Sequence, residues 1–423
     1  MRVLLATDNY PPYIGGAQIQ SHLLASELRD RGHEVVVATV WQSDLPSVEI
    51  DGGVHVHRLR QLRTLPGLAR KRWQHYQPPF PDPVTSISLR RLIGRFEPDI
   101  VHSYGWISYS CAAALLGKNI PLLITARDYG YSCANRTLMR DGEDCSGPAL
   151  LKCTACAGRN YGRPKGWIAA LGVRSSARLL CHKVRAIHSI STYVREIIRR
   201  DFLDDRSSTT QGYVIHDVIG SVPAEPKESD SRLASKRLDE LPKEPFMLFI
   251  GALRAVKGVN ELSAAYELLE KPPPLVLIGT IEPDTPASFP PGVHVLTDFP
   301  RDAVMAACER CLFGVMPSLL PEPFGTVVCE VMSRGKPVIG TEPGGHTDMI
   351  IEGETGLLVP RGDIQALATA MNTLIADSEL RDRFGRAAAV RSREFEASVS
   401  LPRLIRLYAD LTSGRGRGMK GGR

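Results

Sequence analysis

Residues 318–340, SLLPEPFGTVVCEVMSRGKPVIG, decide the fold that we expect, because they join a buried strand to a helix through a Pro-Phe-Gly turn. The apolar run 311–318 before the turn predicts a strand, and 326–335 has a helical pattern that ends at Gly335. Glu322 lies in the turn and Glu330 in the helix. A strand, a polar loop and a helix in this order are typical of a parallel α/β sheet.

The same alternation of apolar runs and helical patterns continues along the whole chain. The strand-like runs are 2–7, 33–40, 98–104, 121–126 and 184–190 in the first half, and 246–253, 274–280, 293–297, 311–318 and 336–342 in the second. Parallel sheets with crossover helices produce such an alternation. We therefore expect an α/β protein with two doubly wound, Rossmann-like domains that face each other across a ligand-binding cleft.

The boundaries of these domains follow from changes in composition. Residues 222–245 are rich in Pro, Ser, Lys and Glu, as expected near a domain junction. We expect a first domain over residues 1–210 and a second over 211–395. An amphipathic pattern predicts a last helix over 396–412, and 413–423 predict a basic, disordered tail.

The composition narrows the class of protein. Of the 423 residues, 43% are hydrophobic and 23% charged, which is enough for a large core, and the formal charge of +6 is too small to indicate nucleic acid. The first apolar run is too short for a signal peptide, and no run is long enough to cross a membrane. We expect a cytoplasmic protein, and the sequence leaves open a peripheral contact with the inner face of a membrane.

Polar groups after the strands of the second half predict a site for a phosphorylated sugar. Glu322 and Glu330 offer carboxylates to hydroxyl groups, and the backbone of Phe324, Gly325, Thr326 and Val327 offers helix-start amides to an anion. Arg254 and Lys257 follow the strand at 246–253, where two cations can neutralise a diphosphate.

A pair of glycines joins the first strand of the chain to its helix. Gly15 and Gly16 allow a backbone to approach a ligand closely, and Gly344 and Gly345 repeat the pair in the second half. Neither pair belongs to a G-x-G-x-x-G sequence, so the dinucleotide-binding fingerprint is absent.

Taken together, these motifs resemble the retaining glycosyltransferases of family four, which have the GT-B fold. The motifs that carry the resemblance are GGAQ (15–18), LRDRGHEVVVAT (28–39), EPDIVHSYG (97–105), the Pro-Phe-Gly stretch with its E-x7-E spacing, and EGETGLLVPRGD (352–363). The resemblance implies that the last helix returns to the first domain. It also implies transfer of a sugar from a nucleotide-diphosphate sugar to a hydroxyl acceptor without a catalytic metal.

The resemblance also implies roles for individual residues. Glu322 would contact the hydroxyls of the donor sugar, Glu330 the ribose, Lys257 the diphosphate, and Gly16 would leave space beside the diphosphate. The family often has Arg where this chain has Ala252, so Arg254 is expected to substitute for it. It often has His near the transferred sugar, where this chain has Arg127, for which we expect a cationic or acceptor-orienting role.

A cysteine-rich loop at 133–156 is the second informative region. Cys133, Cys145, Cys153 and Cys156 are separated by eleven, seven and two residues, and four thiolates suit a structural zinc ion. An iron–sulfur cluster and four reduced thiols are the alternatives.

The acceptor is less well specified by the sequence. Segments 63–80 and 162–184 mix Lys and Arg with Trp and Tyr, which is compatible with an anionic lipid surface or with a solvated helix face. We expect the acceptor to be a polysaccharide, a lipid-linked saccharide or a small metabolite. A GT-B sugar-nucleotide epimerase or phosphorylase and a non-catalytic binder of nucleotide sugars are the alternative functions.

Overall fold

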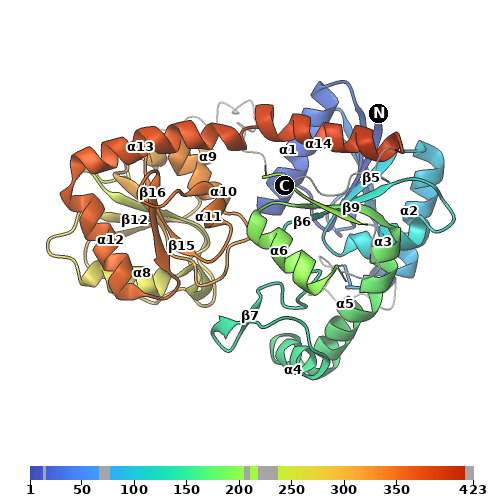
Figure 1. Ribbon diagram of the computed structural model, residues 1–423, viewed down its shortest axis with the longest axis horizontal. Coiled ribbons are helices and arrows are strands. Elements are labelled where there is room, and N and C mark those ends of the chain that lie inside the picture. Colours follow the sequence, from blue (N-terminus) through green and yellow to red (C-terminus); the bar gives the residue numbers. More distant parts are fainter. Residues whose placement is uncertain (13–15, 66–76, 204–209, 218–236, 415–423) are drawn as a thin grey trace. The chain divides into compact units, whose positions relative to one another are not determined.

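The computed structural model describes residues 1–12, 16–65, 77–203, 210–217 and 237–414 (Figure 1). The chain folds into two compact units. The first contains Met1–Val218 together with Leu401–Arg423, and the second contains Ile219–Ser400. Each unit has its own sheet, flanked by helices.

The first unit is organised around a sheet of eight strands in the order β10-β9-β6-β5-β1-β2-β4-β3. The strands are β1 (Arg2–Thr7), β2 (Glu34–Val40), β3 (Val48–Asp51), β4 (Val54–Leu59), β5 (Ile100–Tyr104), β6 (Leu122–Ala126), β9 (Val184–Ser189) and β10 (Gln211–Val214). All neighbours pair in parallel except β3 and β4. The central strands β5 and β6 are buried along their whole length, which explains their continuous apolar runs.

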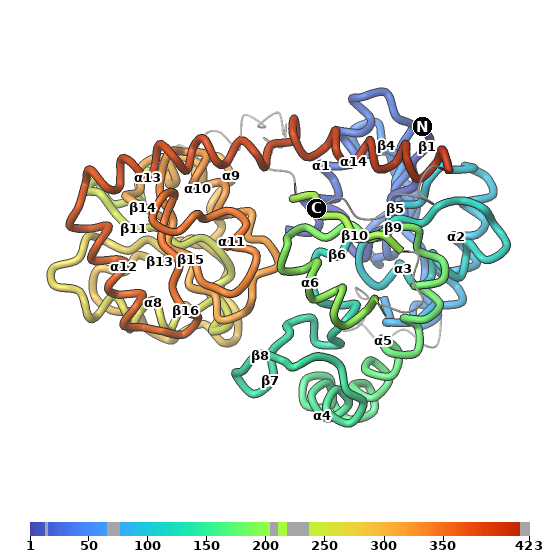
Figure 2. The backbone as a smooth tube through the Cα atoms, in the orientation of Figure 1, coloured from blue at the N-terminus to red at the C-terminus, as the bar shows by residue number. Residues whose placement is uncertain are grey.

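Helices cover this sheet and extend beyond it. They are α1 (Gly16–Asp30), the short 3-10 turn η1 (Leu62–Thr64), α2 (Pro83–Phe96), α3 (Ile107–Ala114), α4 (Leu150–Tyr161), α5 (Arg163–Lys183) and α6 (Thr192–Asp201). The side chains of Asp82 and Ser191 cap α2 and α6 by accepting the N–H of the third helical residue. A small hairpin, β7 (Met139–Arg140) and β8 (Glu143–Asp144), lies outside the main sheet near α4 (Figure 2).

The second unit is built on a fully parallel sheet of six strands in the order β13-β12-β11-β14-β15-β16. Its strands are β11 (Met247–Ile250), β12 (Leu275–Ile278), β13 (Val293–Leu296), β14 (Phe313–Met316), β15 (Val338–Glu342) and β16 (Gly356–Pro360). Its helices are η3 (Ala255–Lys257), α8 (Val259–Glu267), α9 (Arg301–Arg310), α10 (Thr326–Ser333), α11 (His346–Met349), α12 (Ile364–Ala376), α13 (Ser378–Ser392) and η4 (Arg393–Phe395).

The last helix, α14 (Ala397–Thr412), places Leu401, Leu404 and Tyr408 in the core of the first unit. The Tyr408 hydroxyl is hydrogen-bonded to Nδ1 of the buried His102, with 2.5 Å between the two atoms. Apolar burial and a polar contact therefore both fix α14 on this unit.

The observed division of the chain differs from the predicted boundaries. The first unit extends past residue 210 to Val218, because β10 pairs with β9 and so completes the first sheet. The second unit ends at Ser400 instead of residue 395, because the first turn of α14 still belongs to it. Of the predicted tail 413–423, residues 415–423 lie outside the described residues.

Candidate functional site

Lys257 and Glu322 form an ion pair in the second unit. Lys257 ends η3 after β11, and Glu322 lies in the loop between β14 and α10. The Lys257 Nζ donates a hydrogen bond of 2.5 Å to Oε1 of Glu322, and the Ser318 hydroxyl donates one of 2.7 Å to the same oxygen. The Glu322 side chain is 12% exposed and that of Lys257 34%. The carboxylate is thus buried, while the ammonium remains accessible to a ligand.

The charges around Glu322 keep it ionised. Burial alone would raise the pKa of Glu322. The charges of Lys257 and His346 and the hydrogen bonds from Lys257 and Ser318 outweigh burial, so the pKa lies below its ordinary value. At neutral pH the site therefore presents a carboxylate, which accepts hydrogen bonds from hydroxyl groups.

Glycines allow the loops around this pair to pack closely. Gly258 has φ +76°, and a Cβ there would lie 1.9 Å from the carbonyl oxygen of Pro317. A Cβ on Gly345 would lie 2.4 Å from the carbonyl oxygen of Pro323, and the Gly345 N–H donates to the Glu322 carbonyl at 2.6 Å. The sequence predicted that Gly345 approaches a ligand, but the backbone it approaches is that of the Glu322 loop.

Glu330 lies on α10, and one of its carboxylate oxygens has no partner among the described residues. Its Oε1 accepts a hydrogen bond of 2.8 Å from Arg301, and its Oε2 is buried without a donor in the described chain. The side chain is 9% exposed. Burial lowers the pKa of Arg301, but the hydrogen bond and charge of Glu330 outweigh it and raise the pKa overall. A buried carboxylate oxygen without a donor is costly, so this atom suits a ligand hydroxyl.

The start of α10 combines a buried side chain with the backbone amides of a helix N-terminus. Phe324 is buried, and its ring packs against Phe395 at 5.7 Å between centroids. Gly325 has φ +96° and precedes the first helical residue, Thr326. The N–H groups of a first helical turn have no acceptor within the helix. The predicted amide donors at Gly325, Thr326 and Val327 therefore lie at a helix N-terminus, whereas the Phe324 side chain belongs to the core.

Arg254 of the second unit and the glycine loop of the first unit were also predicted to lie beside a diphosphate. Arg254 is 49% exposed and forms an ion pair of 3.3 Å with Asp284. Gly16 begins α1, and a Cβ there would meet no atom within 4 Å, so the space beside it is open. Gly15 lies outside the described residues.

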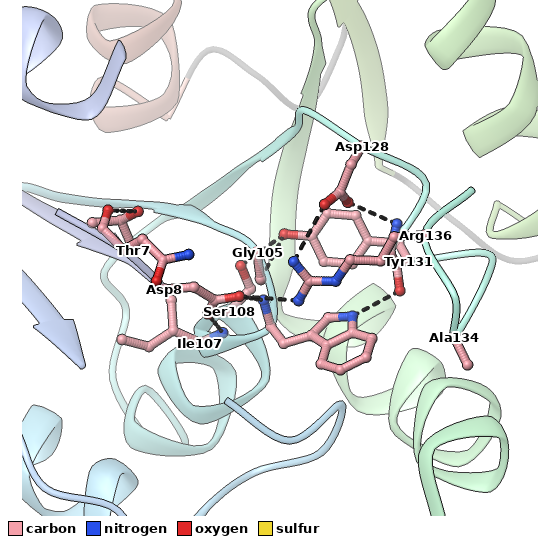
Figure 3. Close-up of polar contacts among 12 residues, drawn as sticks. Thr7, Asp8, Gly105, Ile107, Ser108, Asp128, Tyr131, Ala134 and Arg136 are labelled. Carbon is pink, nitrogen blue, oxygen red and sulfur yellow. Dashed lines mark hydrogen bonds and ion pairs between the residues drawn. The ribbon is translucent and has the colours of Figure 1, made fainter. Parts of the chain in front are cut away.

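A polar cluster that the sequence did not predict lies at the carboxyl ends of β1, β5 and β6 (Figure 3). The Asp8 carboxylate accepts the backbone N–H of Trp106 at 2.9 Å and of Ile107 at 2.8 Å. Arg136 donates to Asp8 at 3.2 Å and to Asp128 at 3.3 Å, and stacks on the Trp106 ring at 4.2 Å. Burial raises the pKa of Asp8 more than Arg136 and the amides lower it.

Arg127 also follows β6, and its guanidinium is already engaged. It forms an ion pair of 3.2 Å with Asp217 and stacks over the Tyr104 ring at 4.6 Å. The two charged side chains are 12% and 8% exposed. The acceptor-orienting role of Arg127 stays a prediction, and its visible contacts bind the end of the first unit to the sheet.

The four cysteines of the predicted metal site line one pocket. Cys133, Cys145, Cys153 and Cys156 share this pocket with the cations Arg140 and Lys152, among other residues. The Ala149 N–H lies 3.4 Å from Cys153 Sγ, and the Asn135 amide 3.2 Å from Cys156 Sγ. In the described part of the chain, no three His, Cys, Asp or Glu side chains are arranged to hold a metal ion. The zinc site therefore stays a prediction.

Comparison with known proteins identifies the family. Residues 15–208 match the model described as "Glycosyl transferase 4-like domain", and 230–391 match that described as "Glycosyl transferases group 1". An uncharacterized glycosyltransferase of Methanocaldococcus jannaschii is 30% identical over 97% of this chain and 99% of its own length. This chain belongs to glycosyltransferase family four. The predicted family is thus confirmed.

Other curated relatives of this glycosyltransferase align over shorter parts. A D-inositol 3-phosphate glycosyltransferase of Corynebacterium efficiens is 31% identical over 39% of this chain and 42% of its own length. A phosphatidyl-myo-inositol mannosyltransferase of Mycobacterium leprae is 36% identical over 23% of this chain and 26% of its own length. The chain thus spans less than half of these relatives.

Solved structures confirm the predicted GT-B fold. Sucrose-phosphate synthase from Thermosynechococcus elongatus has a TM-score of 0.74 at 19% identity, covering 98% of this chain and all of the other. Anabaena HepE in complex with UDP and glucose has a TM-score of 0.66 at 16% identity, covering 97% of this chain and all of the other. In the described residues, no helix has the length and apolarity that crossing a membrane requires.

Proposed function

We propose that this glycosyltransferase moves a sugar from a nucleoside-diphosphate sugar to a hydroxyl acceptor with retention of configuration. The observation that carries the proposal is the buried Oε2 of Glu330, which lacks a donor in the described chain although Arg301 holds the other oxygen. A ribose hydroxyl would supply that donor. Several GT-B structures, such as Anabaena HepE with UDP-glucose, contain a nucleotide or a nucleotide sugar, which supports this class of donor.

The Lys257–Glu322 pair suits both parts of the donor, the diphosphate that leaves and the sugar that is transferred. The accessible ammonium of Lys257 would neutralise charge that develops on the departing diphosphate, because fixed charges aimed at a transition state stabilise it strongly. Glu322, kept ionised by its neighbours, would accept hydrogen bonds from sugar hydroxyls. The helix-start amides at Thr326 and Val327 would contact the phosphate oxygens.

Retention would follow from attack of the acceptor on the same face as the leaving group. Glu322 is engaged by Lys257 and Ser318, so we assign it to binding hydroxyls and not to forming a covalent glycosyl intermediate. The leaving phosphate would take the proton of the acceptor hydroxyl. Charge neutralisation by Lys257 and the amides would serve in place of a catalytic metal, and Arg254 would contribute if it exchanged Asp284 for phosphate.

Substitution of Glu330 tests the proposal. We expect Glu330→Gln to weaken donor binding roughly tenfold or more, because a hydrogen bond to a charged group contributes about 1.5–3 kcal/mol. Isothermal titration with UDP-, GDP- and ADP-sugars would measure it, and Glu270→Gln, at an exposed position in the same unit, is the matched control.

The reaction products separate the alternatives. Coupled release of nucleoside diphosphate and formation of a glycoside whose anomeric configuration matches the donor would support the proposal. Epimerised nucleotide sugar or a sugar phosphate as product would instead identify an epimerase or a phosphorylase. Donor binding that Glu330→Gln leaves unchanged would remove the ribose contact from the proposal.

A further inference from the structure

The segment that contains α4 and α5 has an unusual charge distribution. The whole chain has 46 Asp and Glu among 423 residues, but residues 145–195 contain none. The same segment contains nine Lys and Arg. Seven of these lie on the two helices, namely Lys152, Arg159, Arg163, Lys165, Arg174, Arg178 and Lys183. Arg159 pairs with Asp141, which precedes the segment, but no acid within the segment compensates the other cations.

The outer face of α5 also exposes large apolar side chains. Trp167, Ile168 and Leu171 are 56%, 55% and 46% exposed. At 100° per residue, these positions share one side of the helix with Arg174 and Arg178, which are exposed as well. Among the described residues, neither arginine has an ion-pair partner. The result is a helix face that carries apolar side chains at positions 167, 168 and 171 and cationic side chains one and two turns further along, at 174 and 178.

Close packing on the inner side fixes the orientation of this face. A Cβ on Gly166 would lie 2.2 Å from the backbone nitrogen of Gly158 on α4. A Cβ on Gly172 would lie 2.9 Å from the Phe80 ring. Both glycines are buried. Since α5 contacts α4 and the Phe80 segment through its glycines, it cannot rotate to bury Trp167 and Leu171.

The start of α4 exposes two more large apolar side chains. Leu150 and Leu151 are 46% and 85% exposed. Together with the three residues of α5 they make up five of the 15 large exposed hydrophobic side chains in the described chain. Figure 1 shows α4 at the margin of the first unit, beside α5 and away from α14. We call Leu150, Leu151, Trp167, Ile168 and Leu171 of these two helices, together with Arg174 and Arg178, the α4–α5 face.

We propose that the α4–α5 face docks this enzyme on an anionic lipid bilayer. Cations on such a face are attracted to anionic headgroups, and Trp and aliphatic side chains enter the boundary between headgroups and acyl chains. A nucleic acid would pair with the arginines but would leave the aliphatic side chains in water. The helices would lie on the membrane and not cross it, in agreement with the absence of a membrane-crossing helix in the described residues.

Docking would place the first unit at the surface where a lipid-linked acceptor is found. This inference does not depend on the proposed donor chemistry, because vesicle binding is measured without any substrate. A protein that docks but transfers no sugar would refute only the proposed function, whereas one that transfers sugar but never docks would refute only this inference.

Co-sedimentation of the full chain with vesicles tests the inference. We expect binding to vesicles of equimolar phosphatidylcholine and phosphatidylglycerol, little binding to phosphatidylcholine alone, and weaker binding as salt increases. The double variant Trp167→Ser/Leu171→Ser should lose at least about tenfold in affinity. The control Ile87→Ser removes an apolar side chain of similar exposure, 53%, from α2 of the same unit and should bind normally.

Two further variants separate the contributions to docking. Arg174→Gln/Arg178→Gln should weaken binding to anionic vesicles and reduce its salt dependence. Trp167→Phe should keep docking but lose the part of the fluorescence shift that reports this side chain in lipid. Thermal melts and donor titrations should show that all variants remain folded, because these positions are exposed.

Three outcomes would overturn the inference. The first is equal vesicle binding by the wild type and the Trp167→Ser/Leu171→Ser variant. The second is no binding of the wild type to anionic vesicles. The third is a wild-type dimer that this variant dissociates in the absence of lipid, which would make the α4–α5 face an interface between two copies of the chain.

Discussion

Each unit of this glycosyltransferase carries an ion pair beyond the carboxyl end of a strand, and the two pairs differ in their electrostatics. In the first unit Arg127 pairs with Asp217, and in the second Lys257 pairs with Glu322. Burial raises the pKa of Asp217 above its ordinary value even though Arg127 lowers it. The pKa of Glu322 lies below its ordinary value, because several neighbours together outweigh burial.

The difference shows what a binding site needs beyond a pair of opposite charges. Arg127 is stacked on Tyr104 and only 12% exposed, so a ligand would have to displace protein contacts to reach it. Lys257 is 34% exposed while its carboxylate partner is held by a second donor, Ser318. The pair in the second unit can therefore contact a ligand while its charges remain compensated. The pair in the first unit is too buried to contact a ligand without losing protein contacts.

Removal of Lys257 should have the largest effect. We expect Lys257→Ala to reduce the transfer rate about 10²- to 10³-fold, as for the loss of one transition-state donor. Single-turnover kinetics with saturating donor would measure the effect on the chemical step. Lys243→Ala, at an exposed position of the same unit, should be unaffected. Normal turnover of Lys257→Ala would mean that the Lys257–Glu322 pair, like the Arg127–Asp217 pair, has no demonstrated role in catalysis. It would remove Lys257 from the mechanism.

Acidification should act on the first unit through a buried histidine. His188 is hydrogen-bonded to Thr125 at 3.0 Å and to the carbonyl of Ile215, and Thr125 is in turn bonded to His102 at 2.6 Å. Burial lowers the pKa of His188 to about 4. The hydrogen bond to Ile215 raises the pKa, and the nearby charges of Arg127 and His216 lower it further, so burial and these charges prevail. The folded state thus holds His188 neutral.

The sign of the pH effect follows from this lowered pKa. The stability due to neutral His188 is complete above the unfolded pKa of about 6.5 and is lost as the pH falls toward 4, on the order of 3 kcal/mol in total. Urea unfolding near pH 7 and near pH 5 would measure this loss in the free energy of unfolding. His188→Gln should be less stable near pH 7 but should lose less on acidification. An equal loss in both proteins would mean that His188 does not titrate in this range.

The predicted zinc site should have the smallest effect on the donor site. We expect one zinc per purified chain and none in Cys153→Ser/Cys156→Ser, measured by elemental analysis, with Cys111→Ser as a control outside the pocket. Donor affinity should change less than about twofold, because the cysteines belong to the first unit and Lys257 and Glu330 to the second. Metal-free wild type with four titratable thiols would refute the zinc site.

More of the candidate residues that the sequence singled out in the second unit lie in contact with one another or with a described partner than in the first. Lys257 and Glu322 could be singled out because each follows a strand with a clear apolar pattern, and Glu330 because it lies on the helix that comes directly after the Glu322 loop. Ser318 and Glu322, which share a hydrogen bond, are only four positions apart and both lie within residues 318–340. Arg301 gave no such signal, because its contact with Glu330 depends on how α9 and α10 pack.

The cluster around Asp8 shows why the first unit was harder to predict. Asp8 and Arg136 are 128 positions apart, and Arg136 comes from the cysteine-rich loop with a positive φ of 61°. A pattern of nearby residues cannot predict a contact between positions so far apart in the sequence. A sequence pattern could predict that the strands end at one edge, but not which side chain of a long loop returns to that edge.

The sequence by itself determined the two mainly parallel sheets, the loops at the ends of their central strands and the residue types available there. It could do so because burial on both faces requires continuous apolar runs and because tight turns require glycine. Only the tertiary structure decided which charges meet, which carboxylate oxygen is left without a donor, and which helix face stays exposed. These depend on packing between segments far apart in the chain, where burial and neighbouring charges together set the ionisation of each group.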